Sequence, residues 1–340
     1  MSDGRYSRQE RFRPIGQKGQ SKLAGSHVLI IGAGALGTSS SEQLVRAGVG
    51  KLTIVDRDYV ELSNLQRQQL YTEADAAAHL PKAEAAKRRL SSINSTVSIE
   101  GVIADVQREE LLRLADGVDL MMDGTDNFET RMLMNDVAQK YNIPYIYGGC
   151  VGGNGLVFSI LPEKTPCLGC LLERVPLGGA TCDTVGVISP AVQMVTALQV
   201  AEALKILTGD FARVNPALMT FDLWNNDRTS IKVSNARRKD CPSCGDSPVY
   251  PYLEEDNATK FAVLCGRDTV QIRPSGTMKR DFAELKRRLP SEKVKENPFL
   301  LSYDHGKHHR MVFFRDGRVL IHGTKDVIDA KKLYYEIVGG

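Results

Sequence analysis

The 340-residue sequence has almost no excess of charge of either sign, no long apolar run and no region of low complexity. Its 44 Lys and Arg residues against 41 Asp and Glu leave a formal net charge of +3, which argues against a surface devoted to nucleic acid. The longest apolar stretch, Val28–Leu36, is interrupted by glycines and is far shorter than a membrane span. We therefore expect neither nucleic acid nor a membrane among its partners.

The N-terminal residues 1–13 are charged and lack the apolar core of a signal peptide, which predicts a soluble cytoplasmic protein. The composition, 42% hydrophobic and 25% charged, is that of an ordinary globular protein, and the length suggests about two domains. Seven cysteines are an odd number, and four of them form two C-x-x-C pairs. In a reducing compartment this usage favours metal binding over disulfides.

Short apolar runs alternate with stretches of helical periodicity between about residues 20 and 160, a pattern typical of a parallel sheet covered by helices. The runs expected to be strands are 27–31, 52–55, 97–103, 118–122 and 143–147. Further strands are expected at 155–161, 218–223 and 229–233, and a long apolar helix at 190–207. The sequence thus predicts an α/β fold with a Rossmann-like, mostly parallel sheet extended by antiparallel strands.

A domain boundary is expected after residue 246, where Gly245-Asp-Ser-Pro and an acidic stretch interrupt the pattern. Residues 1–246 would form the α/β domain and residues 257–340 a small α+β module. The module has 17 Lys and Arg against 10 Asp and Glu, a net charge of +7. Its expected elements are helices at 281–289 and 326–338 and a hairpin of 310–314 with 318–321. Its role is left open.

A glycine-rich motif follows the first expected strand. Gly32, Gly34 and Gly37 are spaced as G-x-G-x-x-G between that strand and the next helix. Small residues let the main chain approach phosphates, and the helix N-terminus supplies N–H donors. Asp56, at the end of the second strand, is placed to accept the hydroxyls of a ribose. This combination predicts a nucleotide-binding site; the alternative is a tight turn without a ligand.

Further charged residues follow the same strands. Asp58, Arg67, Lys82, Asp126 and Arg131 lie near or after strand ends. Several cations beside a ribose site suggest a triphosphate, and a carboxylate at a strand's carboxyl end suits Mg²⁺. Taken singly, each cation would more often be a solvated surface charge; as a set on one sheet edge they favour a functional site.

The two C-x-x-C pairs are Cys167 with Cys170 and Cys241 with Cys244. Four thiolates would make a closed tetrahedral zinc site of a structural kind. The 70 residues between the pairs would make the site a long-range cross-link. Two separate redox dithiols are the alternative interpretation.

Several motifs in this order resemble the ThiF/MoeB/HesA family, bacterial relatives of ubiquitin-activating enzymes. They are Arg5-Tyr-Ser-Arg8-Gln, Gly-Ala-Gly-Ala-Leu-Gly37, Asp56-Arg-Asp58, Ser63-Asn-Leu-Gln-Arg67-Gln, Pro81-Lys82, Gly124-Thr-Asp126-Asn127, both C-x-x-C pairs and Thr181-Cys182. The resemblance covers roughly residues 5–246. It implies ATP-dependent adenylation of the C-terminal glycine of a small ubiquitin-like sulfur carrier protein, with release of pyrophosphate, in molybdopterin or thiamine biosynthesis. It also implies a homodimer with a zinc ion on each subunit.

The resemblance assigns roles to individual residues. Asp56 would hold the ribose, Gly34 and its neighbours would line the phosphates, and Asp126 would hold Mg²⁺. The residues that would contact the phosphates are Asn64, Arg67 and Lys82, and Asp58 matches a second acid of the family's site. Arg8 matches an arginine that the family contributes across the dimer to the partner's site.

Cys182 matches a family cysteine that some members use for covalent sulfur transfer and others do not need. Its glycine-containing surroundings leave two possibilities, a chemical role and a bystander thiol. Two other functions also remain open from the sequence: an NAD-dependent oxidoreductase that uses the same glycines, and a nucleotide-sensing module without catalytic activity.

Overall fold

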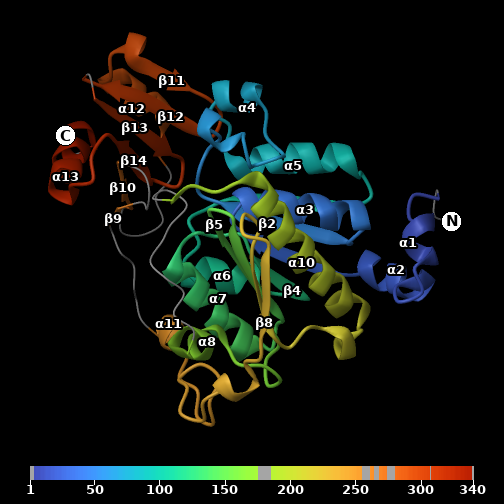
Figure 1. Cartoon of the computed structure of the whole chain (residues 1–340). Helices are drawn as coiled ribbons and strands as arrows, with labels where there is room; N and C mark the ends of the chain where they lie inside the picture. Colours follow the sequence, from blue (N-terminus) through green and yellow to red (C-terminus); the bar gives the residue numbers. More distant parts are fainter. Residues whose placement is uncertain are drawn as a thin grey trace. The chain divides into compact units, whose positions relative to one another are not determined.

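The computed structural model describes residues 4–174, 185–254, 261–263, 268–273, 280–306 and 308–338. They belong to two compact units, of which the larger ends at residue 256 and the smaller begins at residue 257 (Figure 1).

The larger unit contains the sheet strands β1 to β8 and the helices that cover them. The strands are β1 (His27–Ile31), β2 (Lys51–Asp56), β3 (Ser98–Ile103), β4 (Leu120–Asp123), β5 (Tyr145–Val151), β6 (Asn154–Ile160), β7 (Leu218–Asp222) and β8 (Asp227–Ile231). The longer helices are α2 (Gly16–Ala24), α3 (Ala35–Ala47), α5 (Lys82–Ile93), α7 (Phe128–Tyr141) and α10 (Ser189–Thr208). The shorter ones are α1 (Ser7–Arg11), η1 (Leu62–Asn64), α4 (Glu73–Ala77), α6 (Arg108–Leu114), α8 (Leu168–Arg174), η2 (Phe211–Arg213), η3 (Ser234–Ala236) and α11 (Pro251–Glu254).

The eight strands form one mixed sheet in the order β3-β2-β1-β4-β5-β6-β7-β8. The pairings from β3 to β5 are parallel, and those from β5 to β8 are antiparallel. The predicted Rossmann-like sheet with antiparallel additions is therefore confirmed. Strand order reverses between β1 and β4, and ligands of such sheets bind beyond the carboxyl ends of the strands at this point.

Helices cover both faces of this sheet. α3, α5 and α10 pack on one face, and α6 and α7 pack on the other (Figure 1). Alternate residues of each strand point to opposite faces of the sheet. Leu29, Ile31 and Met121 point to one face and belong to the core cluster that includes residues of α6 and α7. Burial on both faces is why these strands read as continuous apolar runs.

α10 is the predicted long apolar helix, and it is a helix of the core. It is long and apolar enough by composition to cross a membrane, but 61% of that window is buried inside the structure. It contacts α2, α3, β5 and β6. Burial among these elements accounts for its apolar composition without a membrane.

Three helix ends of the larger unit have residues suited to those positions. Asn127 is the N-cap of α7, and its side chain accepts a hydrogen bond from Thr130 N–H at 3.1 Å. Gly48 and Gly209 end α3 and α10 in the left-handed conformation that glycine adopts without strain.

The smaller unit is a six-stranded antiparallel sheet with two helices, which confirms the predicted α+β module. Its strands are β9 (Phe261–Val263), β10 (Thr269–Ile272), β11 (Val294–Glu296), β12 (Leu300–His305), β13 (His309–Phe314) and β14 (Val319–His322), in the order β11-β12-β13-β14-β10-β9. The helices are α12 (Phe282–Arg288) and α13 (Val327–Val338), with a short turn η4 (Ser291–Lys293). Residues of both helices share one apolar cluster with Met311, Phe313 and Ile321.

Candidate functional site

The glycine-rich turn joins β1 to α3 at the reversal point of the sheet. Gly32 has φ +97°, and a Cβ atom there would lie 2.4 Å from the carbonyl oxygen of Gly124, in the turn after β4. A Cβ at Gly37 would lie 1.8 Å from the oxygen of Gly32. Gly34 is the N-cap of α3. The two turns therefore touch main chain to main chain, and N–H groups at the start of α3 are available to an anion.

Asp56 ties the end of β2 to this turn. Its Oδ2 accepts a hydrogen bond from Ala33 N–H at 2.6 Å, and its Oδ1 accepts one from Asp58 N–H at 2.7 Å. Burial raises the pKa of the Asp56 carboxyl above its ordinary value, and the nearby Lys82 ammonium opposes this shift. Each carboxylate oxygen has a second lone pair, so Asp56 can accept hydrogen bonds from ribose hydroxyls in addition to those from the two N–H groups.

Lys82 is buried rather than solvated. It opens α5, its side chain is 5% exposed, and its Nζ lies 3.5 Å from Asp58 Oδ2. A buried ammonium is costly unless it is paired or serves a ligand. The interpretation of Lys82 as an ordinary surface charge is therefore wrong.

Asn64 and Arg67 belong to the segment around η1. Asn64 is buried, and its Oδ1 accepts a hydrogen bond from Glu61 N–H at 3.1 Å, so its first role is to shape this turn. Arg67 is half-buried and donates through Nη1 to Ser63 O at 2.9 Å. Its remaining guanidinium donors can turn to a phosphate.

Arg131, which the sequence grouped with the cations of the site, instead forms hydrogen bonds that hold the end of β4 beneath the site. Its Nε donates to Asp123 Oδ2 at 2.8 Å and one Nη donates to Thr125 O at 2.6 Å. Asp123 also accepts from Tyr145 OH, and its main-chain oxygen accepts from Gln199 at 3.1 Å. Burial raises the pKa of Asp123, and Arg131 opposes that rise. The group holds the end of β4 in place.

Asp126 lies above this framework in the turn between β4 and α7. Its side chain is exposed and makes no hydrogen bond or ion pair within the described part of the chain. Its neighbours hold the turn instead: Thr125 N–H donates to Asp123, and Asn127 N–H donates to Thr125. A free carboxylate on a turn fixed by other residues suits a cation held chiefly by phosphates and water, as Mg²⁺ is.

Arg8 lies at the other end of α3. α1 is tied to that end because Gln9 donates to Ala47 O at 2.9 Å, whereas Gly34 caps the end that faces the nucleotide site. A helix of 13 residues is about 20 Å long. The exposed Arg8 therefore lies too far from its own glycine-rich turn to touch a ligand there.

The four cysteines of the C-x-x-C pairs converge in one buried cluster, as predicted. Their sulfur atoms all lie within 4.8 Å of one another. Cys167 lies 3.6 Å from Cys241, and Cys170 lies 3.6 Å from Cys244. Sulfurs about 2.3 Å from one zinc ion stand about 3.8 Å apart in a tetrahedron. The donor set and spacing fit one shared Zn²⁺, and two separate redox dithiols do not describe a cluster in which both pairs meet.

A buried polar pair in α7 supports both halves of this cluster. Asn135 Oδ1 accepts from Leu168 N–H at 2.8 Å, in the first C-x-x-C turn. Asp136 accepts from Ser243 Oγ at 2.6 Å, in the second turn, and from Tyr252 N–H at 2.9 Å. Nothing in the sequence pointed to these two residues, because a polar pair inside a helix is usually exposed.

We expect Asp136→Ala to loosen the metal. The hydrogen bonds from Ser243, Tyr252 N–H and Asn135 Nδ2 lose their acceptor, so stability should fall by about 1–3 kcal/mol. Zinc bound by the cysteines should pass to a chromogenic chelator about tenfold faster. The matched control is Glu129→Ala, an exposed acid of the same helix. Equal release rates in the two variants would contradict a supporting role for Asp136.

Cys182 lies outside the described residues, so the expectation about sulfur transfer stays a prediction. The description resumes at residue 185, and Gly186 O accepts a hydrogen bond from Gly152 N–H at 2.7 Å, in the turn between β5 and β6.

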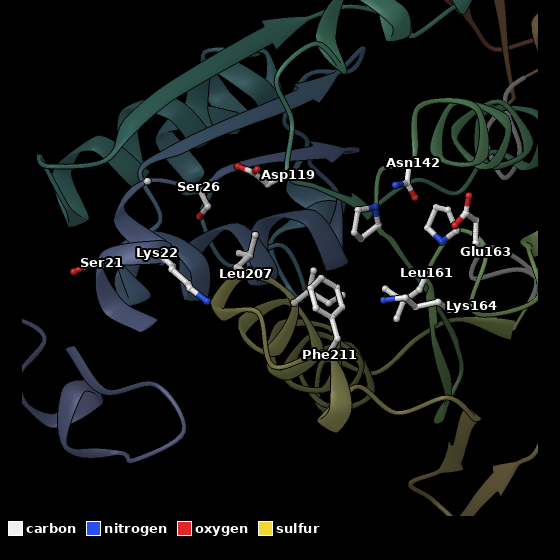
Figure 2. Close-up of a pocket in the computed structure, with 14 residues that line it drawn as sticks. Ser21, Lys22, Ser26, Asp119, Asn142, Leu161, Glu163, Lys164, Leu207 and Phe211 are labelled. Carbon is white, nitrogen blue, oxygen red and sulfur yellow. The ribbon is translucent and has the colours of Figure 1, made fainter. Parts of the chain in front are cut away.

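A cavity of about 480 Å³ lies at the opposite edge of the sheet, at the amino ends of β1, β4 and β5. Figure 2 shows Lys22 and Lys164 among its lining residues. Lys22 donates to Thr208 O at 2.7 Å, and Lys164 lies over the ring of Phe211. Both ammonium groups therefore interact with residues that line the cavity. The cavity lies at the amino ends of the strands, away from the glycine-rich turn.

The fold and the two sites define an α/β protein with a Rossmann-like sheet, a glycine-rich turn of the kind that binds nucleotides, and four clustered cysteines that fit a metal ion. The sequence pattern of the ThiF family matches residues 6–243, and the chain belongs to this family.

Relatives of known function extend the comparison. The sulfur carrier protein ThiS adenylyltransferase of Bacillus subtilis (strain 168) is 53% identical over 338 residues, which cover 99% of each chain. The Escherichia coli (strain K12) protein of the same name is 36% identical over 248 residues, 73% of this chain and 97% of that one. Among solved structures, E. coli MccB with ATP is 25% identical with a TM-score of 0.60, covering 72% of this chain and 75% of that one.

Proposed function

We propose that this protein is an adenylyltransferase that uses ATP to activate the C-terminal glycine carboxylate of a small ubiquitin-like sulfur carrier protein in the cytoplasm. The whole-length similarity to a ThiS adenylyltransferase carries this proposal and favours a carrier of the ThiS kind, in thiamine biosynthesis. A molybdopterin carrier is the other candidate, since relatives named MOCS3 are 33% identical over 72% of the chain.

The proposed reaction needs alignment and charge stabilisation. A carboxylate oxygen of the carrier attacks the α-phosphorus of ATP, the bond from that phosphorus to the bridging oxygen breaks, and pyrophosphate leaves with the electron pair. The attacking group is already an anion, so no general base is required. Lys82, Arg67 and N–H groups at the start of α3 would stabilise the charge that develops on the phosphates.

Three groups would complete the site. Asp126 would hold Mg²⁺, which when bound neutralises phosphate charge and orients the leaving group. Asp56 would hold the ribose. Arg8 would act in the site of a second copy, because its own glycine-rich turn is about 20 Å away. The proposed assembly is therefore a homodimer with two composite sites.

Pyrophosphate exchange tests the proposal. The enzyme, ATP, Mg²⁺ and labelled pyrophosphate should form labelled ATP only when a carrier with an intact C-terminal glycine is added. The carrier should gain one AMP by mass spectrometry, and a carrier shortened by its last two residues should be inert. The absence of exchange with both ThiS-type and molybdopterin-type carriers would refute the proposal, and tight NADH binding without ATP binding would favour an oxidoreductase.

A further inference from the structure

One buried hydroxyl joins two elements of the nucleotide site. Tyr71 lies in the irregular segment between η1 and α4, and it is 7% exposed. Its OH lies 2.6 Å from Ala33 O, in the glycine-rich turn, and 3.2 Å from Lys82 O, in the first residue of α5. Residues 33 and 82 come from separate parts of the chain, and the Tyr71 hydroxyl contacts both.

Hydrogen bonds hold both the N–H and the carbonyl group of Ala33. Its N–H donates to Asp56 Oδ2 at 2.6 Å, and its carbonyl accepts from Tyr71. The residue is completely buried and stands between Gly32 and Gly34. These two hydrogen bonds fix Ala33 in the turn, beside the bonds from Gly32 N–H to Val55 O and from Thr38 Oγ1 to Gly34 O.

Lys82 is held in the same manner. Its main-chain N–H donates to Asp58 O at 2.9 Å, its carbonyl receives the longer contact from Tyr71, and its ammonium lies beside the Asp58 carboxylate. The base of this long side chain is therefore fixed relative to the glycine-rich turn. A small displacement of that base would move the ammonium away from the phosphates.

The hydroxyl is a constant donor. Burial raises the pKa of Tyr71 well above its ordinary value, and the charge of Asp56 raises it further. The group therefore keeps its proton throughout the range in which the enzyme would work, and no counter-ion is needed beside it.

We propose that Tyr71 is a positioning residue of the adenylation site, whose hydroxyl sets the distance between the glycine-rich turn and the Lys82 ammonium and thereby tunes the affinity for ATP. The inference rests on the proposed function, since it takes Lys82 as a phosphate ligand. Tyr71 itself is buried behind the turn and acts by holding Lys82 at a fixed distance from Ala33, so its effect on ATP binding requires the Lys82 ammonium.

The test is Tyr71→Phe, which removes one oxygen atom and keeps the ring. Affinity for ATP with Mg²⁺ is measured by titration with a fluorescent ATP analogue and competition by ATP, and stability by thermal unfolding. We expect affinity to fall about tenfold. The matched control is Ser26→Ala, which removes another buried hydroxyl donor, to Leu23 O at 2.8 Å, at the opposite end of β1. It should lower the Tm to a similar extent and leave ATP affinity unchanged.

A double-mutant cycle with Lys82→Ala separates positioning from general stability. If Tyr71 acts through Lys82, the double variant should bind ATP less than about twofold more weakly than Lys82→Ala alone. A difference of that size is within the error of such a cycle. Unchanged affinity in Tyr71→Phe, an equal loss in Ser26→Ala, or a full tenfold loss in the Lys82→Ala background would overturn this inference. Normal ATP binding by Lys82→Ala alone would instead remove Lys82 from the proposed site.

Discussion

Asp126→Ala should abolish carrier-dependent pyrophosphate exchange and leave the fold unchanged. The carboxylate is exposed and has no partner in the described part of the chain, so its loss breaks no contact of the folded protein. Surface substitutions of this kind change stability by at most about 0.5 kcal/mol. If Asp126 holds Mg²⁺ as proposed, removing this carboxylate should slow exchange by about a thousandfold.

The measurement is the initial rate of exchange at saturating ATP, with the Tm recorded for each variant. Glu129→Ala is the matched control, because Glu129 is an exposed acid three residues further along, in the first turn of α7. It should retain wild-type exchange. A normal rate in Asp126→Ala would show that the metal is bound elsewhere.

Arg8→Ala should also inactivate the enzyme. Its activity should return in part when it forms mixed dimers with the Asp126→Ala variant, which is itself inactive. Arg8 is exposed on α1, at the end of α3 remote from the glycine-rich turn of its own chain. Loss of a guanidinium that stabilises developing phosphate charge should cost about a hundredfold in exchange rate. Arg11→Ala, on the same short helix and also exposed, should have no such effect.

Mixing Arg8→Ala with Asp126→Ala distinguishes an arginine from the partner subunit from one within the same chain. In a mixed dimer, the site with intact Asp126 receives Arg8 from the other subunit. After random exchange of subunits, about a quarter of all sites should be complete and the rate should recover to that extent. Sedimentation should give dimers for each variant alone. Recovery that never exceeds the sum of the two variants would contradict a shared site.

The arrangement of the proposed nucleotide site was predictable because its residues follow strand ends. Parallel strands that turn into helices place their carboxyl ends on one edge, so Gly32, Asp56 and Asp126 had to meet there once the strands were recognised. The spacing of the two C-x-x-C pairs predicted one shared cysteine cluster, with two separate dithiols as the alternative. The described structure brings these groups to the positions expected, and the substitutions proposed for them test their chemical roles.

Contacts made by irregular segments were not predictable. Tyr71 reaches Ala33 across 38 residues from a segment without periodicity. Asn135 and Asp136 sit inside a helix, where the pattern gives no sign that polar residues are buried. The reason is physical: these contacts depend on tertiary packing, which local pattern does not encode.

The smaller unit illustrates the same limit in its strands. The hairpin of β13 and β14 was predicted from two apolar runs around Asp316-Gly317. β12 was missed, because the residues Leu300 to Tyr303 are all buried and show no alternation. β10 was missed because Thr269-Val-Gln-Ile is only four residues long and half of them are polar, and it pairs with β14 some fifty residues later.

The close approach of Gly32, Gly37 and Gly124 has a consequence for how the enzyme responds to its surroundings. A methyl group at any of these positions would overlap main-chain atoms, so the floor formed by these three glycines consists of main-chain amide dipoles. Amide dipoles neither gain nor lose protons between acid and alkaline conditions. Any dependence of nucleotide affinity on acidity must therefore arise from the nucleotide itself or from the ring of ionisable groups around that floor.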